Sequence, residues 1–185
     1  MDLNRVHLEE LAAERGIDPL FLERDLVLTE IIWRYTQHDV GAQLVLKGGQ
    51  ALRHIYGSVR VSGDIDYVSA RRVDFDELRD ALIIKHRTLS IRVPDEPAGV
   101  TGRSVKVSPI EYRGPMGIPG KVEVDVSYRD DLYFPADVVP FNSPYRDVFE
   151  VQAMQIDEMV AEKVRALTQR GHPRDLKALI AASFS

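Results

Sequence analysis

The sequence predicts an α+β fold, with a small mixed sheet flanked by helices. Three observations predict it: helical patterns lie near the start of the chain and again near its end, and between them come segments in which apolar and polar residues alternate as they do in strands. We expect a core at residues 1–150, which includes the N-terminal helices, and a C-terminal helical lobe at residues 151–185 that completes a cleft.

Two helices and a strand that stops at two glycines are expected first. Residues 5–15 form a helical pattern that ends at a glycine, and Asp18-Pro19 supplies an N-cap and a first-turn proline for a helix that reaches about residue 38. A short buried strand at residues 44–46 then meets two glycines, and residues 50–56 have room for two helical turns.

The middle of the chain predicts strands. After a strand around residues 64–67, a capped helix is expected at 76–87 and further strands at 89–93 and 104–110. The clearest strand is at 121–128, where valines occupy one face and carboxylates the other.

The last part of the chain predicts an irregular segment and then two helices. Prolines at positions 135, 140 and 144 are unsuited to the centre of a sheet, so we expect this segment to lie over the surface. Helical periodicity returns at residues 156–170 and 174–182.

Composition excludes several classes of protein. The chain has 185 residues, 44% of them hydrophobic and 29% charged, which suits a globular protein with an ample core. It has no cysteine, so disulfides, thiolate metal sites and a cysteine nucleophile are excluded, and a reducing cytoplasm is the expected location. The charged, amphipathic start is unlike a signal peptide, and no apolar run is long enough to cross a membrane.

Charge is unevenly distributed along the chain. The net charge of −5 excludes a general nucleic-acid coat, yet residues 47–92 hold 9 Lys and Arg against 6 Asp and Glu, a local excess of +3. This excess is compatible with a small basic patch for phosphate or RNA, and equally with a mixed solvated surface.

Two glycines and two aspartates form the first candidate site. Gly48 and Gly49 would let a phosphate approach the backbone, and Asp64 and Asp66, two residues apart on a strand, would point to one face and share a divalent metal. The alternative is an aspartate-rich surface turn. We favour the metal site, because an acidic strand face is costly without solvent or a cation to compensate it.

A third carboxylate is expected from the strand at 121–128. Glu123 and Asp125 share its polar face, and Asp125 is the better candidate because Glu123 lies nearer the start of the strand. An edge strand with one solvated face would show the same pattern.

Lys163 is the third candidate. On a helical wheel it lies within an apolar stripe of Ile156, Val160, Val164 and Leu167, opposite Glu158, Glu162, Arg165 and Gln169. A lysine there needs a carboxylate or a substrate phosphate, unless its amine extends past the core to water. Arg170, Arg174 and Asp175 follow closely enough to complete a polar pocket.

Other kinds of site are not supported. The five histidines lack the helical spacing of a zinc site, and no nucleophilic triad can be assembled. Gly48-Gly49 lacks the third glycine of a dinucleotide-binding loop, so no dinucleotide cofactor is expected.

Two ordered motifs resemble those of a known family. The segment LKGGQALRHIYGSVRVSGDIDY contains a lysine and two glycines, a short helix and then R-x-S-x-D-x-D, which are Lys47, Gly48, Gly49, Arg60, Ser62, Asp64 and Asp66. The segment EMVAEKVRALTQRGHPRDLKAL contains A-E-K and R-D-L, with Lys163, Arg170, Arg174 and Asp175. Together they resemble the AbiEii/MenT nucleotidyltransferase toxins over roughly residues 20–179.

The resemblance implies a DNA-polymerase-β-like core and a toxin that transfers nucleotides from an NTP to RNA, at the acceptor end of tRNA, to block translation. It implies Mg²⁺ or Mn²⁺ and a cognate antitoxin of the AbiEi type. The implied catalytic residues are Asp64, Asp66, Lys163 and Asp175; the implied nucleotide-binding residues are Lys47, Gly48, Gly49, Arg60, Ser62 and Arg174. The expected metal ligands are Asp64, Asp66 and Asp125.

The sequence also departs from the family pattern. His172 stands where lysine is frequent and Ala178 where aspartate is frequent, and no serine follows Gly48. The sequence leaves open transfer to a small molecule or a protein hydroxyl, and an inactive nucleotide-binding module.

Overall fold

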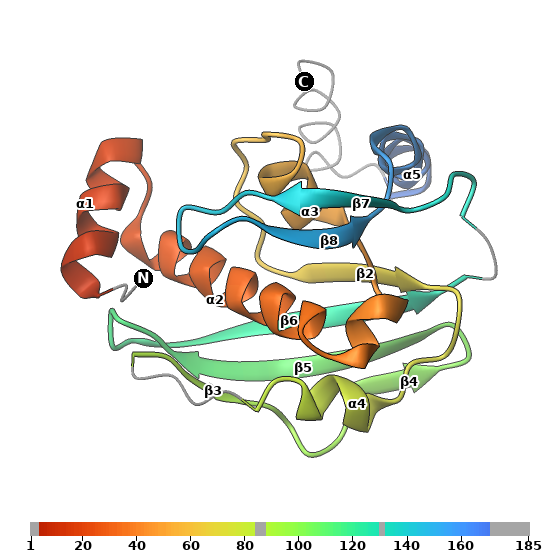
Figure 1. Cartoon of the computed structure of the whole chain (residues 1–185), viewed down its shortest axis with the longest axis horizontal. Helices are drawn as coiled ribbons and strands as arrows, with labels where there is room; N and C mark the ends of the chain where they lie inside the picture. The colour runs from red at the N-terminus through yellow and green to blue at the C-terminus, as the bar shows by residue number, and fades with distance from the viewer. Residues whose placement is uncertain (1–3, 84–87, 130–131, 171–185) are drawn as a thin grey trace.

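The computed structural model describes residues 4–83, 88–129 and 132–170, and shows an eight-stranded mixed sheet with helices packed on it (Figure 1). The strand order is β3-β5-β6-β2-β1-β8-β7, with β4 paired to β5. The predicted α+β class is therefore confirmed. The expected helix at 174–182 lies outside the described residues.

The two N-terminal helices begin and end where the caps indicate. Helix α1 (Arg5–Arg15) is capped by the Asn4 side chain and ends at Gly16, whose φ of 62° suits glycine. Asp18 accepts a hydrogen bond from the Leu20 N–H and so caps α2 (Pro19–Thr36). A short 3-10 helix, η1 (Asp39–Gln43), leads from α2 to the sheet.

The centre of the sheet is built from four segments that hold the predicted site. Strand β1 (Val45–Lys47) runs directly into α3 (Gly48–His54) and is antiparallel to β2 (Ile65–Ser69). Strand β2 is parallel to β6 (Pro119–Tyr128), which confirms the clearest strand of the sequence and extends it by two residues at its start.

One side of the sheet is antiparallel. Strands β3 (Ser90–Arg92) and β4 (Gly99–Thr101) both pair with β5 (Ser104–Arg113), and the short helix α4 (Phe75–Asp80) precedes them in the chain. Strand β4 lies between the strands expected at 89–93 and 104–110, where no strand was predicted. It forms a tight hairpin with β5, in which Val100 pairs with Val105.

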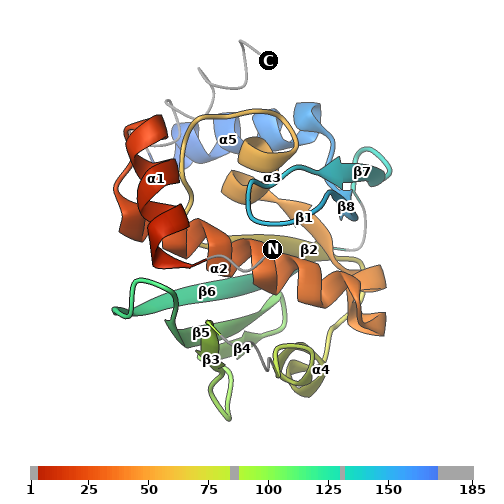
Figure 2. The ribbon, with the colours of Figure 1, turned by 60° about the vertical axis from the view of Figure 1, so that its left-hand side comes forward.

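The other side of the sheet corrects one expectation. The proline-rich segment contains β7 (Asp137–Phe141), which pairs with β8 (Phe149–Ala153) as a hairpin at the sheet edge (Figures 1 and 2). An edge strand tolerates Pro140 because it needs hydrogen bonds on one side only. Strand β8 is parallel to β1 and spans position 150, so the sheet continues through the expected domain boundary.

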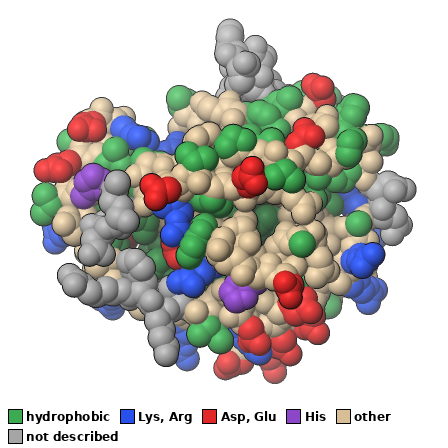
Figure 3. Space-filling view, viewed as in Figure 1, with side chains coloured by type: hydrophobic (Ala, Val, Ile, Leu, Met, Phe, Trp, Pro, Cys, Tyr) green, Lys and Arg blue, Asp and Glu red, His purple; other side chains and the backbone are tan. Residues whose placement is uncertain are grey.

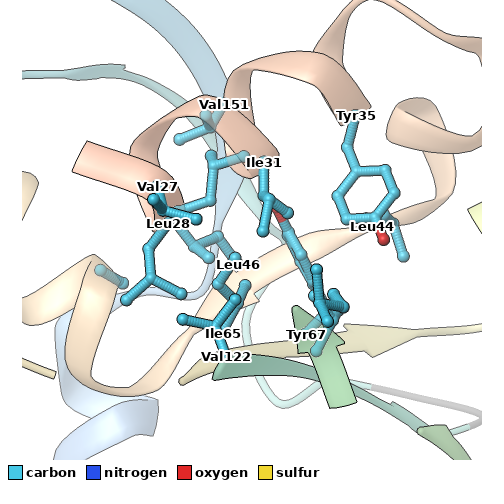
Figure 4. Close-up of a cluster of buried hydrophobic side chains, with 14 of the residues drawn as sticks. Val27, Leu28, Ile31, Tyr35, Leu44, Leu46, Ile65, Tyr67, Val122 and Val151 are labelled. Carbon is cyan, nitrogen blue, oxygen red and sulfur yellow. The ribbon is translucent and has the colours of Figure 1, made fainter. Parts of the chain in front are cut away.

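The core lies between α2 and one face of the sheet. Figure 4 shows Val27, Leu28 and Ile31 of α2 clustered with buried side chains from β1, β2, β6 and β8. Tyr35 packs edge-on against Tyr67, with ring centroids 5.9 Å apart. In the described residues no helix is long and apolar enough to cross a membrane. With the core on one face, the polar residues of the same strands occupy the other.

Candidate active site

A row of charged side chains crosses the face of the sheet opposite the α2 core. Strand register places Lys47 beside Asp66, Asp66 beside Asp125, and Asp125 beside Lys106, on four neighbouring strands. Residues aligned in this way point to the same face. The prediction that a third carboxylate would come from β6 therefore has a direct geometric basis, since Asp125 is the pairing partner of Asp66.

Glu123 is engaged elsewhere. Its carboxylate accepts a hydrogen bond of 2.8 Å from the Lys106 amine and one of 3.3 Å from the Ser108 hydroxyl. Asp125, and not Glu123, is among the residues that line the cavity described next. The structure thus favours Asp125 over Glu123 as the third carboxylate.

A cavity of about 440 Å³ lies over three members of this row, Lys47, Asp66 and Asp125. It brings together nine of the sequence-predicted residues: Lys47, Gly48, Gly49, Arg60, Ser62, Asp64, Asp66, Asp125 and Lys163. Its walls come from β1, α3, the loop after α3, β2, β6 and α5 (Ile156–Arg170). Arg174 and Asp175 lie outside the described residues, as does the side chain of Arg170.

Asp66 is a carboxylate of the cavity whose pKa is shifted by its surroundings. Burial raises its pKa above the ordinary value for aspartate, and the negative charges of Asp64 and Asp125 act in the same direction. The positive charges of Lys47 and Lys163 oppose that rise without cancelling it. Ionised Asp66 is therefore destabilised and would be stabilised by an additional cation.

The two glycines make room for side chains of the site. Gly48 has φ of 72°, and a Cβ there would overlap the Asp66 carboxylate. A Cβ at Gly49 would overlap the Ser62 hydroxyl. The glycines were predicted to give a phosphate access to the backbone, and that role stays a prediction. What the geometry adds is that no larger residue fits beside Asp66 and Ser62 as they stand.

Helix α5 has the predicted bounds, but its predicted apolar stripe is wrong. Glu158 and Met159 are buried, at 3% and 2% exposure, whereas Val164 is 47% exposed. The helix covers a polar cavity, so the face turned towards the protein carries carboxylates and Lys163, and hydrophobic periodicity misplaces it. Lys163 does line the cavity, as predicted, and its charge reaches Asp66.

Sequence reasoning missed Glu162 and Arg129. The Lys47 amine donates to the Glu162 carboxylate at 3.3 Å, and Arg129 forms an ion pair with the same carboxylate. Arg129 also lies 4.0 Å from Glu158, which accepts backbone hydrogen bonds from residues 133 and 134. The A-E-K motif was a signal for Glu162, because it precedes Lys163; Arg129 had none.

A buried network supports the loop that carries Arg60, Ser62 and Asp64. Arg53 donates one hydrogen bond to Asp25 at 3.0 Å and another to the Val59 carbonyl at 3.2 Å. Asp25 is fully buried and also contacts His54 and the Tyr145 hydroxyl, each at 3.1 Å. Burial raises the pKa of Asp25, but His54 and Arg53 outweigh it and hold the pKa below its usual value.

The carboxylates of the cavity line it from separate positions. Within the described ranges, no three His, Cys, Asp or Glu side chains already converge as a metal-binding group. The donor set nevertheless suits a hard divalent cation, because oxygen ligands are what Mg²⁺ and Mn²⁺ prefer.

Comparisons with solved structures support the fold. The protein JHP933 from Helicobacter pylori superimposes with a TM-score of 0.66 at 18% identity, covering 88% of this chain and 65% of that one. A protein from H. pylori described as a candidate nucleotidyltransferase gives a TM-score of 0.65 at 17% identity, covering 87% of this chain and 67% of the other. The chain thus spans about two thirds of these neighbours. No curated protein matches it.

The family model described as "Nucleotidyl transferase AbiEii toxin, Type IV TA system" matches residues 30–176, which include both motifs and every residue of the charged row. The chain therefore belongs to the AbiEii family of nucleotidyltransferase toxins.

Proposed function

We propose that the protein transfers nucleotides from an NTP to RNA, at the acceptor end of tRNA, and thereby blocks translation. One observation carries the proposal: Asp64, Asp66 and Asp125 line the same cavity as the cations Lys47 and Lys163. Nucleotidyl transfer needs carboxylates that hold divalent metal and cations that neutralise phosphate, placed within one nucleotide's length of each other. Membership of the AbiEii family supports this reading.

Asp64, Asp66 and Asp125 are the residues that would hold Mg²⁺ or Mn²⁺. The fit rests on Asp66, whose buried carboxylate lies beside two other negative charges and has a raised pKa. A bound divalent ion supplies charge neutralisation at the transferred phosphate and at the attacking oxygen.

Side chains of the cavity would bind the triphosphate. Lys47 and Lys163 neutralise the triphosphate, which lies over Gly48 and Gly49. Arg60 and the Ser62 hydroxyl contact its outer oxygens, and this role for Ser62 replaces the serine missing after Gly48. Arg174 and Asp175 are assigned to nucleotide binding and to catalysis by the family resemblance alone.

The reaction exchanges one phosphorus–oxygen bond for another. The acceptor hydroxyl oxygen forms a bond to the α-phosphorus of the NTP, the bond from that phosphorus to the β-phosphate oxygen breaks, and pyrophosphate leaves. Asp125 accepts the proton of the hydroxyl, because it lies on the β6 side of the metal pair, away from the lysines that hold the triphosphate.

The test offers labelled NTPs and Mg²⁺ to the protein with total RNA in one reaction and protein extract in another. Label in the RNA alone supports the proposal. Label in protein, or in neither pool, contradicts it and indicates a protein hydroxyl, a small-molecule acceptor or an inactive module. The variant Asp66→Asn should abolish transfer while remaining folded, and transfer retained by that variant would overturn the assignment of Asp66.

The proposed setting is the bacterial cytoplasm, with a cognate antitoxin of the AbiEi type. Family membership implies an antitoxin. Co-expression with the neighbouring gene product should restore the growth of cells that the protein alone inhibits.

A further inference from the structure

Segments that carry four arginines meet at one corner of the sheet, where the parallel strands β2 and β6 both end. The Tyr128 N–H donates to the Arg103 carbonyl at 2.7 Å, and the Arg129 N–H donates to the Ser69 carbonyl at 3.0 Å. Arg71 and Arg72 follow β2 after one intervening residue, Ala70. We call Arg71, Arg72, Arg103 and Arg129 the arginine corner. Figure 1 shows the ends of β2 and β6 beside the β4–β5 hairpin at this edge.

The turn of the β4–β5 hairpin carries Arg103 and lies next to the segment that follows β2. A Cβ at Gly102, in the hairpin turn, would lie 3.8 Å from the Arg72 guanidinium. Residue 103 follows in the chain, so the Arg72 guanidinium lies beside the hairpin turn that carries Arg103, although the two residues are about thirty positions apart in the sequence. In Figure 3, Lys and Arg side chains gather at the right-hand edge, where these elements end in the same view.

The corner is positive and accessible. Arg71, Arg72 and Arg103 are exposed, and in the described part of the chain no ion pair joins any of them to a carboxylate. Three guanidinium groups that form no ion pair with a described carboxylate are notable on a chain with a net charge of −5. Guanidinium groups bind phosphate oxygens through paired hydrogen bonds, so such a cluster suits a polyanion.

The corner meets the cavity at Arg129, the one corner arginine that lines it. Ser127 on β6 also lines that cavity, and Arg129 directly follows β6, roughly 13 Å from Asp125 at the rise of an extended chain. Lys47 and Gly48 flank the metal pair on the β1 side, and the corner flanks it on the β6 side. The triphosphate and the acceptor must approach the reacting phosphorus from different sides, since one leaves as the other attacks.

We propose that the arginine corner binds the phosphodiester backbone of the acceptor RNA and directs its terminal hydroxyl towards Asp125. This inference rests on the proposed transfer to RNA. An acidic protein would also match the charge. Continuity with the cavity favours RNA, because an acceptor must reach Asp125 whereas a protein partner need not.

The experiment compares two double variants that remove the same charge. Arg72→Gln with Arg103→Gln changes the corner. Arg92→Gln with Lys121→Gln is the control, since both residues are exposed at the opposite end of the same sheet. Affinity for a short fluorescein-labelled single-stranded RNA of mixed sequence is measured by anisotropy over a range of salt concentrations. The Kd for Mg²⁺-NTP is measured in parallel.

The corner variant should bind the RNA roughly tenfold more weakly, with a salt dependence shallower by about 1.4, which is ~0.7 for each lost phosphate contact. Its Kd for NTP should be unchanged. The control should resemble the wild type in both. Equal loss of RNA affinity in the two variants would overturn the proposal, as would unchanged RNA affinity with weaker binding of polyglutamate, which would assign the corner to an acidic protein. Because binding needs no turnover, these outcomes are separate from failure of label to enter RNA.

Discussion

The variant Gly48→Ala tests whether this glycine is required by Asp66 or by its own backbone conformation. Two glycines of the chain have nearly the same left-handed φ, 72° at Gly48 and 73° at Gly57. A Cβ at Gly48 would overlap the Asp66 carboxylate, whereas a Cβ at Gly57 would have no atom within 4 Å. Gly57→Ala is therefore a matched control that carries the backbone strain alone.

The strain of a left-handed alanine is about 1–2 kcal/mol and should be common to both variants. At ~2–4 °C for each kcal/mol in a chain of this length, Gly57→Ala should lower Tm by a few degrees and leave transfer intact. Gly48→Ala must also displace the Asp66 carboxylate. A displacement of about 1 Å at a catalytic group costs on the order of 10²-fold in rate, so we expect transfer to fall by that factor.

Thermal unfolding and the initial rate of labelled NTP transfer measure the two effects on the same preparations. Wild-type activity in both Gly48→Ala and Gly57→Ala would refute the reasoning, since it would mean that Asp66 is either unmoved by the new methyl group or unimportant. A loss of activity in Gly57→Ala equal to that in Gly48→Ala would refute it too, because strain alone would then explain the effect.

Three other predictions follow from buried groups. Because the folded-state pKa of Asp66 is raised, its ionisation costs stability at neutral pH and that cost vanishes as pH falls below the unfolded pKa; Asp66→Asn should therefore raise Tm at pH 7 but not near pH 3, in unfolding scans. Arg53→Lys keeps the positive charge beside Asp25 but loses the second hydrogen bond, to the Val59 carbonyl, so KM for NTP should rise while kcat changes little. Steady-state kinetics measure both constants, and Tyr145→Phe is the control, which should lose stability without a change in KM. Phe141→Ala should lower the free energy of unfolding by about 3–5 kcal/mol in denaturant titrations, because the ring is fully buried between His54 and Phe149. A decrease of less than about 1 kcal/mol would show that Phe141 of β7 does not contribute to the core.

The elements that sequence reasoning located well are those whose signals are local. The N-cap and proline at Asp18-Pro19 fixed the start of α2, and the alternation at 121–128 identified β6. Strand β7 was missed because a proline is unsuited to the centre of a sheet but is tolerated in an edge strand. Only the pairing with β8, eight or more residues later, shows that this segment forms an edge strand. Such information is not contained in the segment itself.

The candidate site could be predicted in part for the same reason. Asp66 and Asp125 were identified because each lies on the polar face of a strand in which apolar and acidic residues alternate, and the strand register places them side by side. The partners of Glu162 could not be found in this way. A helical wheel sorts side chains by hydrophobicity, whereas Glu162 faces inwards because it meets Lys47 and Arg129 there.

Strand β6 has an apolar face that serves stability and a polar face that lines the cavity. Val122, Val124 and Val126 face the α2 core and are buried, while Asp125 and Ser127 on the same strand line the cavity. The apolar face contributes burial free energy that offsets the cost of desolvating charges on the other face. Removing a charge from the cavity face should therefore weaken chemistry without unfolding the strand, and removing a valine should do the reverse. The strand that carries Asp125 is thus held in place by residues that do not line the cavity.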